Sequence, residues 1–234
     1  MKLARLVALL LVLPALAGCG GEDRGGAATL WVTRDRGAEL LHDERIEAGL
    51  TVMRALRGVA DVETRYGGRF VQSIDGTAGS VAQRRDWFYF VNGYEADRGA
   101  AETRIRPGDV VWWDFRSWSG RLQQPVVVGA FPEPFLHGWD GKRRPAVVRI
   151  VNGVPRAAAL RVAKAIGGAQ VVGLGAAIAD DANVLDLADG PARFLATLRK
   201  PGSPPGSPVR FTYAGDLDEL LNEKPSFLRR YEVR

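Results

Sequence analysis

The sequence predicts an α+β fold with two modules: a small sheet that carries one short helix, and a second small α+β module after it. Three observations lead to this prediction. Strand-like runs separated by turn dipeptides fill residues 29–120, only one stretch among them has helical spacing, and the strands are rich in aromatic residues. Nine of the twenty aromatic side chains lie between Asp86 and Trp118. Such a sheet needs a helix on one face to bury its apolar side chains.

The first 19 residues have the pattern of an export signal. Lys2 and Arg5 flank the start of an apolar run over residues 6–16, which is too short for a membrane span of ~20 residues. The run ends in L-A-G-C, and its Cys19 is the only cysteine of the chain. This pattern resembles a bacterial lipoprotein signal. The resemblance implies removal of residues 1–18, attachment of palmitate-type acyl chains to Cys19, and a location at the extracytoplasmic face of the cell membrane. Ordinary secretion with an incidental cysteine is the alternative.

Composition divides the rest of the chain into three parts. The Gly-rich stretch over residues 19–28 is expected to be a flexible tether. We place the first module at residues 29–120. The second module, at residues 125–234, is poorer in aromatic residues and is interrupted by a Pro/Gly-rich loop at residues 201–208.

One helix is expected in the first module. Thr51 is a suitable N-cap, because its side chain can accept a hydrogen bond from a backbone N–H of the first turn. Val52, Leu56 and Val59 follow at helical spacing and predict the buried face. Gly58 marks the end of the helix.

Turn residues bound the strands of the first module. Asn92-Gly93 after an aromatic run is a strong hairpin signal, because both residues tolerate positive φ. Pro107-Gly108 turns into the last aromatic strand. The expected extended segments are residues 29–33, 38–46, 62–74, 87–91 and 110–116.

The second module is expected to alternate strands and helices. Its run from Gly173 to Ile178, G-L-G-A-A-I, is similar to a dinucleotide-binding fingerprint, but Ile178 occupies the place of the third small residue, so a loop is expected. The predicted strands are residues 126–128, 146–151, 170–172, 184–187, 194–198 and 209–213, and the predicted helices are residues 155–166 and 216–221.

Composition excludes several chemistries. One cysteine and two histidines, His42 and His137, cannot form an internal disulfide or a structural zinc site within one chain. The sequence has no motif of serine hydrolases, zinc proteases or P-loop NTPases. Of the 32 basic residues 27 are arginine in a Gly-rich chain, so the net charge of +5 is weak evidence for a nucleic-acid partner. We therefore expect no catalytic residues, no metal site, no resident cofactor and no nucleic-acid partner.

Four motifs carry a family resemblance. They are T-V-M-R-A-L from Thr51, W-F-Y-F-V-N-G from Trp87, G-A at Gly99, and I-R-P-G-D-V-V-W-W from Ile105. In this order and spacing they resemble the transcobalamin C-terminal-like family over residues 29–118, a family that includes the small β-domain of the vertebrate cobalamin carriers. The resemblance implies a β-grasp-like module and a cobalamin-like compound as ligand. The helical barrel that holds cobalamin from the other side in those carriers has no counterpart in this sequence.

The candidate ligand contacts are Trp87, Tyr89 and Tyr94, around the Asn92-Gly93 turn. Strand alternation puts Trp87 and Tyr89 on one face, and Tyr94 returns beside them after the hairpin. The resemblance implies that the strand opened by Trp87 helps to face a corrin. The residues alone leave two interpretations open: a binding surface on an uncovered sheet face, or packing in a core.

Two functions remain. One is a membrane-anchored lipoprotein that binds a small, largely planar hydrophobic ligand. The other is an adaptor or structural envelope lipoprotein that docks a protein partner such as a transporter subunit. A concave, aromatic-lined pocket would favour the first function, and a flat exposed aromatic patch would favour the second.

Overall fold

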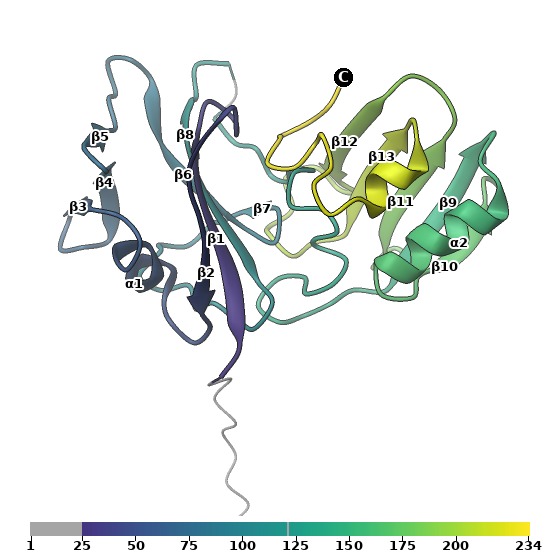
Figure 1. Ribbon diagram of the computed structural model, residues 1–234, viewed down its shortest axis with the longest axis horizontal. Helices are drawn as coiled ribbons and strands as arrows, with labels where there is room; N and C mark the ends of the chain where they lie inside the picture. Colours follow the sequence, from purple (N-terminus) through teal and green to yellow (C-terminus); the bar gives the residue numbers. More distant parts are fainter. Residues whose placement is uncertain (1–24, 121) are drawn as a thin grey trace, which may run out of the picture.

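The computed structural model describes residues 25–120 and 122–234, and it is built on two five-stranded sheets and one smaller sheet (Figure 1). Cys19, the leader and most of the expected tether lie outside the described residues. The mixture of sheets with two α-helices confirms the predicted α+β class. None of the helices in the described range has the length and apolar character needed to span a bilayer.

The first sheet has the strand order β2-β1-β8-β6-β7, with β1 parallel to β8 and the other pairs antiparallel. Its strands are β1 (Ala27–Arg34), β2 (Glu39–Glu47), β6 (Arg85–Val91), β7 (Tyr94–Glu95) and β8 (Val110–Ser117). The small sheet consists of β3 (Val62–Arg65), β4 (Phe70–Ile74) and β5 (Thr77–Ala78). It lies on the side of the first sheet that is remote from the second sheet (Figure 1).

The predicted helix and hairpin are confirmed. Helix α1 (Val52–Arg57) begins after Thr51, whose hydroxyl accepts a hydrogen bond from the Arg54 N–H at 3.3 Å. Leu56 is fully buried, and Val59 packs against the same core. Asn92 and Gly93 have φ angles of +50° and +79°, the left-handed values that a two-residue turn between β6 and β7 requires.

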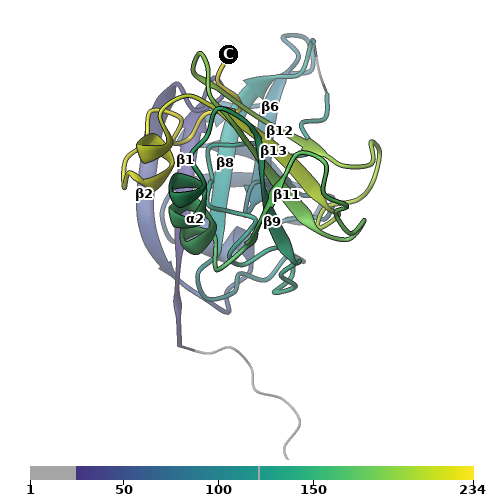
Figure 2. The same ribbon diagram turned by 90° about the vertical axis from the view of Figure 1, so that its right-hand side faces the viewer.

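The second sheet has the order β10-β9-β11-β13-β12 and is mostly parallel, with β12 antiparallel to β13. Its strands are β9 (Ala146–Asn152), β10 (Gln170–Gly173), β11 (Asn183–Ala188), β12 (Arg193–Leu198) and β13 (Val209–Ala214). Figure 2 shows α2 (Arg156–Ala165) and the yellow turn of η1 (Leu217–Leu221) on the same side of this sheet. The run Gly173–Ile178 leaves β10 as a loop, as predicted.

Two predicted extended segments are wrong. Residues 62–74 are not one segment but two antiparallel strands, β3 and β4, with a turn at residues 66–69. Residues 126–128 form only an isolated bridge, between Val126 and Tyr94. Their backbone bonds diverge, because the Val127 N–H donates to the Gly93 carbonyl and the Val128 N–H donates to the Tyr231 carbonyl. The apolar run is buried because it lies between the two sheets: Val126 and Val128 belong to the core of the second sheet and Val127 to a core against the first.

Both faces of the first sheet are covered. One face packs against α1 and the small sheet, with Leu56 and Ile74 fully buried there. The other face packs against the segment between the sheets and the C-terminal residues, where Trp112 and Tyr231 meet with ring centroids 5.4 Å apart. The aromatic strands of the first module therefore lie inside the protein.

Candidate functional site

Two of the sequence-predicted ligand residues, Trp87 and Tyr89, are core residues. The Trp87 ring lies 5.2 Å from that of Phe115, and the Tyr89 ring stacks on Trp113 at 4.9 Å. Their polar atoms are satisfied: Trp87 Nε1 donates to the Thr77 carbonyl at 2.8 Å, and the Tyr89 hydroxyl donates to the Arg98 carbonyl at 2.6 Å. Burial raises the pKa of Tyr89 to about 12. Neither side chain presents a surface to a ligand in this structure.

The third predicted residue, Tyr94, lies opposite Val91 in the strand register, as expected, but its ring packs elsewhere. It belongs to the core of the second sheet and meets the Trp139 ring edge-on at 6.0 Å. The Tyr94 hydroxyl donates to the Ser207 carbonyl at 2.8 Å, and burial raises its pKa. Tyr94 therefore contacts Trp139 and Ser207, two residues that line a cleft.

We call this depression of about 430 Å³ the Trp139 cleft. It combines one partly exposed aromatic ring with a run of three cationic side chains, Lys142, Arg143 and Arg144, and a Pro-rich opposite wall. Its other lining residues are Asp140, Pro145, Asp181, Pro204, Pro205, Gly206 and Ser207. All six tryptophans lie within the described residues, and of these Trp139 and Trp118 alone are partly exposed.

A buried polar residue positions the loop that carries Trp139. The Asn92 side chain is fully buried; its Nδ2 donates to Asp109 Oδ1 at 2.7 Å and to the Gly138 carbonyl at 2.8 Å, while its Oδ1 accepts from the Val110 N–H at 2.8 Å. It thus connects the β6–β7 turn, the start of β8 and the Trp139 loop. The sequence interpretation treated Asn92-Gly93 as a turn alone and missed this second role.

The electrostatics of the cleft favour an anion. Arg143 donates to the carbonyls of Ile166 and Gly167, just after α2, and Arg144 donates to those of Gly206 and Asp181. These bonds to neutral carbonyls fix the guanidinium groups without cancelling their charge. Two acids also line the cleft, Asp140 and Asp181. Asp140 forms an ion pair with Arg98, with 2.7 Å between its Oδ2 and the Arg98 Nη2.

A second depression, of about 590 Å³, adjoins the cleft, and Arg143, Arg144 and Pro145 line both. Its walls are mostly small and apolar, including Val172 and Ile178. Its remaining lining residues are Ala146, Val147, Gly168, Ala169, Gln170, Ala177, Ala179 and Ala182. Together the two adjoining depressions offer an aromatic side chain, fixed positive charge and apolar walls.

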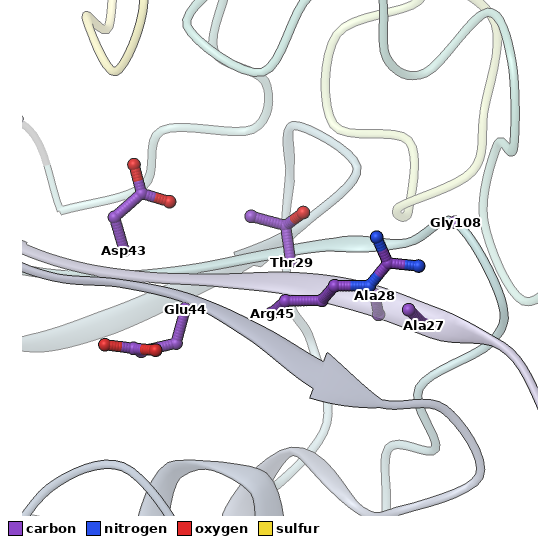
Figure 3. Close-up of a pocket in the computed structure, with 7 residues that line it drawn as sticks. All are labelled: Ala27, Ala28, Thr29, Asp43, Glu44, Arg45 and Gly108. Carbon is purple, nitrogen blue, oxygen red and sulfur yellow. The ribbon is translucent and has the colours of Figure 1, made fainter.

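Another depression, of about 460 Å³, lies beside β1 and β2 (Figure 3). No aromatic side chain lines it, and Asp43 and Glu44 point to opposite sides of β2. Asp43 already accepts from Trp31 Nε1 and from Arg229, each at 2.9 Å. The Asp43 carboxylate is therefore already engaged by protein groups and is poorly placed to bind a ligand in this depression.

The Asp140-Gly141 dipeptide is a sequence signal for the Trp139 cleft, and it lies outside the motifs interpreted from the sequence. Trp139 and Lys142 flank Asp140-Gly141, and both turn residues adopt positive φ, +51° and +69°. Asp-Gly is a preferred dipeptide for a two-residue hairpin turn, so it displays its two flanking side chains side by side. A tryptophan and a lysine in those positions, followed by two arginines, mark an exposed aromatic and cationic turn.

Comparison with known proteins places the family match in the first module. Residues 49–117 match the model of a family described as "Domain of unknown function (DUF4430)". The four motifs of the sequence resemblance lie within or at the edges of this range. No curated protein matches the chain.

Two solved structures are similar to part of the chain. One, from Ruminococcus gnavus ATCC 29149, is described as a "putative metal binding protein"; it is 16% identical, with a TM-score of 0.33, over 40% of this chain and 98% of that one. The other is haptocorrin in complex with Cbi, 15% identical, with a TM-score of 0.35, over 45% of this chain and 28% of that one. The haptocorrin match spans less than a third of that protein.

Proposed function

We propose that this protein is a membrane-anchored, extracytoplasmic lipoprotein that binds a small ligand with a flat apolar body and an anionic group. The observation that carries the proposal is the Trp139 cleft, in which one partly exposed indole ring lies beside three consecutive cationic side chains. Such a surface supports binding, because it offers apolar contact and fixed charge to a ligand.

Each part of the site suits one part of such a ligand. The Trp139 side chain is partly exposed in the cleft, with the Arg98 guanidinium 5.4 Å from its ring centroid, so the exposed part of the indole suits the edge of a flat apolar body. The fixed guanidinium groups of Arg143 and Arg144 suit a phosphate or carboxylate. The adjoining apolar depression accepts the remainder of the ligand. A cobalamin-like compound, the ligand implied by the sequence resemblance, has this composition, with a flat corrin ring and a phosphodiester.

Calorimetric titration tests the ligand. The protein is the chain from residue 19 with Cys19→Ser, and the probes are cyanocobalamin and dicyanocobinamide, which lacks the nucleotide phosphodiester. We expect weak, micromolar binding, because the open cleft leaves one side of the ligand in water. Cobalamin should bind more tightly than cobinamide, and Lys142→Ala should reduce that difference.

Matched tryptophan variants test the site. Trp139→Ala should weaken binding of both compounds about tenfold, the loss of roughly one stacking contact. Trp118→Ala, which removes the other partly exposed tryptophan, should leave binding unchanged. Absence of heat with both compounds, or equal effects of the two variants, would contradict the proposed site.

The anchor has its own test. Cys19→Ser should move the protein from the membrane fraction to the soluble fraction, because the acyl chains on Cys19 would supply its stable attachment to the membrane. Unchanged fractionation would contradict the lipid anchor.

The adaptor function needs an exposed aromatic sheet face, whereas both faces of the first sheet are covered within residues 25–120 and 122–234.

A further inference from the structure

The most exposed aromatic side chain of the described chain lies far from the Trp139 cleft, on the β3–β4 hairpin. Tyr66 is 78% exposed and Phe70 is 40% exposed. Their rings meet edge-on with centroids 6.3 Å apart. We call residues 65–70, which join β3 to β4, the hairpin tip.

The backbone of the hairpin tip holds these rings outward. Tyr66, Gly67 and Gly68 all have positive φ, +53°, +68° and +87°. The two glycines adopt this conformation without strain, whereas a tyrosine at positive φ is uncommon and costs free energy. Nothing lies within 4 Å of where a Cβ would stand on Gly67 or Gly68, so the tip projects into open space.

Cationic side chains flank the ring pair. Arg65 and Arg69 are exposed and form no ion pair among the described residues, but the charge of Arg65 acts on the Asp86 carboxyl of β6, where burial raises the pKa and Arg65 opposes that rise. Arg57 from α1 donates to the Thr64 hydroxyl beside them. The acid on the hairpin, Glu63, accepts from the Ser73 hydroxyl at 2.9 Å, which leaves its charge in place. The three cations Arg57, Arg65 and Arg69 therefore stand against two carboxylates, those of Glu63 and Asp86, and the tip keeps a net positive charge.

We propose that the hairpin tip docks on an anionic phospholipid surface. Tyrosine and tryptophan are enriched at the boundary between acyl chains and headgroups, and arginine pairs with headgroup phosphates. An exposed tyrosine ring and a partly exposed phenylalanine ring in edge-on contact, each with an arginine next to it in the sequence, suit that boundary. The inference does not depend on the lipid anchor or on the ligand of the cleft.

The position of the hairpin tip gives this contact a consequence. The small sheet lies across the first sheet from the second sheet (Figure 1). The Trp139 cleft is lined by the loops that lead into β9, β11 and β13 of the second sheet. A tip bound to lipid therefore orients the molecule with the cleft directed away from the bilayer. Such a contact serves orientation, since acyl chains already suffice for retention.

Vesicle binding tests the proposal with the chain from residue 19 carrying Cys19→Ser, which has no lipid and no cysteine. We expect it to sediment with phosphatidylglycerol-containing vesicles at low salt, less in high salt, and little with pure phosphatidylcholine. The double variant Tyr66→Ser/Phe70→Ser should weaken vesicle binding at least about fivefold. Val81→Ser removes an apolar side chain that is 82% exposed on another loop and should leave vesicle binding unchanged.

A second readout separates insertion from simple attraction. Phe70→Cys and Val81→Cys, each introduced into the Cys19→Ser chain and labelled with a polarity-sensitive dye, report on the two loops. Dye emission should rise with anionic vesicles at position 70 and stay constant at position 81. Equal sedimentation of the double variant and the parent, or an unchanged dye at position 70, would overturn the proposal. If the parent protein does not bind vesicles, and the double variant instead loses an envelope protein that co-purifies with the parent, the tip docks on a protein partner and the proposal is overturned.

Discussion

The two large sheets differ in how they are covered. The first sheet is buried on both faces, by α1 and the small sheet on one side and by the C-terminal residues on the other. The second sheet packs α2 against one face, and its other face carries polar residues, among them Arg149 and Asp186, joined by two hydrogen bonds of 2.8 and 2.7 Å. Aromatic content is thus highest where burial is two-sided.

This difference changes what the aromatic strands mean. A strand with large rings on both faces indicates a binding surface only if one face stays open. In β8, Trp112 points to one core, while Val111 and Trp113 point to the other, so no ring of this strand is available to a ligand. The ligand site that we propose lies instead on a turn between the sheets, where Trp139 is close to a run of cations.

The largest expected effect comes from removing a ring between the layers. Trp112 is fully buried, and its Nε1 donates to the Thr33 hydroxyl at 2.8 Å. Trp112→Ala should lower the free energy of unfolding by about 3–5 kcal/mol, because the cavity cannot be refilled from either layer. Thr197→Ala, on an exposed position of the second sheet, should change it by less than about 0.5 kcal/mol. Comparable losses in denaturant titrations of the two variants would contradict two-sided burial.

The opposite face of the first sheet is tested by Leu56→Ala. Leu56 is fully buried between α1 and the sheet. The variant should lose about 2–5 kcal/mol of stability, the usual cost of truncating a buried leucine. Leu160→Ala, on the exposed side of α2 and 50% exposed, is the matched control and should cost less than about 1 kcal/mol. If Leu56→Ala lowered the free energy of unfolding by less than the control does, α1 would not pack on the first sheet as the structure has it.

Local signals predicted much of this fold. Thr51 as an N-cap, the Asn92-Gly93 turn and the turn before Val110 all act within a few residues, and the structure has each of them. The alternation in β8 was also predictable, because strand geometry assigns neighbouring side chains to opposite faces.

Contacts between distant segments could not be predicted in this way. The second cover of the first sheet comes from residues such as Tyr231, more than a hundred positions from Trp112 in the sequence, and no local pattern encodes that approach. For the same reason Trp87, Tyr89 and Tyr94 had two open interpretations, and the structure buries all three. The Trp139 cleft was missed because it depends on Asn92 reaching the Gly138 carbonyl, a contact across 46 positions.

The C-terminal cover is tested by Tyr231→Phe. Asp114 is fully buried and accepts from the Thr33 hydroxyl, from the N–H groups of Arg36 and Gly37, and from the Tyr231 hydroxyl at 2.8 Å. Removing one donor leaves a buried carboxylate short of a partner, so stability should fall by about 1.5–3 kcal/mol in denaturant titration. Tyr66→Phe, which loses a solvent-exposed hydroxyl, should have no measurable effect. If the Tyr231→Phe protein were as stable as the parent, the hydrogen bond from Tyr231 to Asp114 would not help to hold the C-terminal residues on the first sheet.

The smallest expected effect is a pH dependence at the junction of the two sheets. Glu133 is buried and accepts from both the backbone N–H and Nδ1 of His137, and this hydrogen bond raises the pKa of His137 above its ordinary value of 6.5. A raised pKa in the folded state means that protonated His137 stabilises the fold fully below about pH 6.5, and that this contribution disappears as the pH rises through the folded-state pKa. Asp109 supports the protonated form and Arg143 opposes it.

Thermal melting of the parent and of His137→Gln, from about pH 5 to about pH 9, measures this contribution directly. Burial raises the pKa of Asp109 as well, but Asp109 is present in both proteins, so its own pH dependence largely cancels in the difference. The parent should exceed the variant in melting temperature most at the acidic end, and the difference should shrink steadily toward alkaline pH. A difference that stays constant, or grows with pH, would show that the Glu133–His137 pair does not hold its proton in the folded state. The junction would then depend on Asn92 and apolar packing alone.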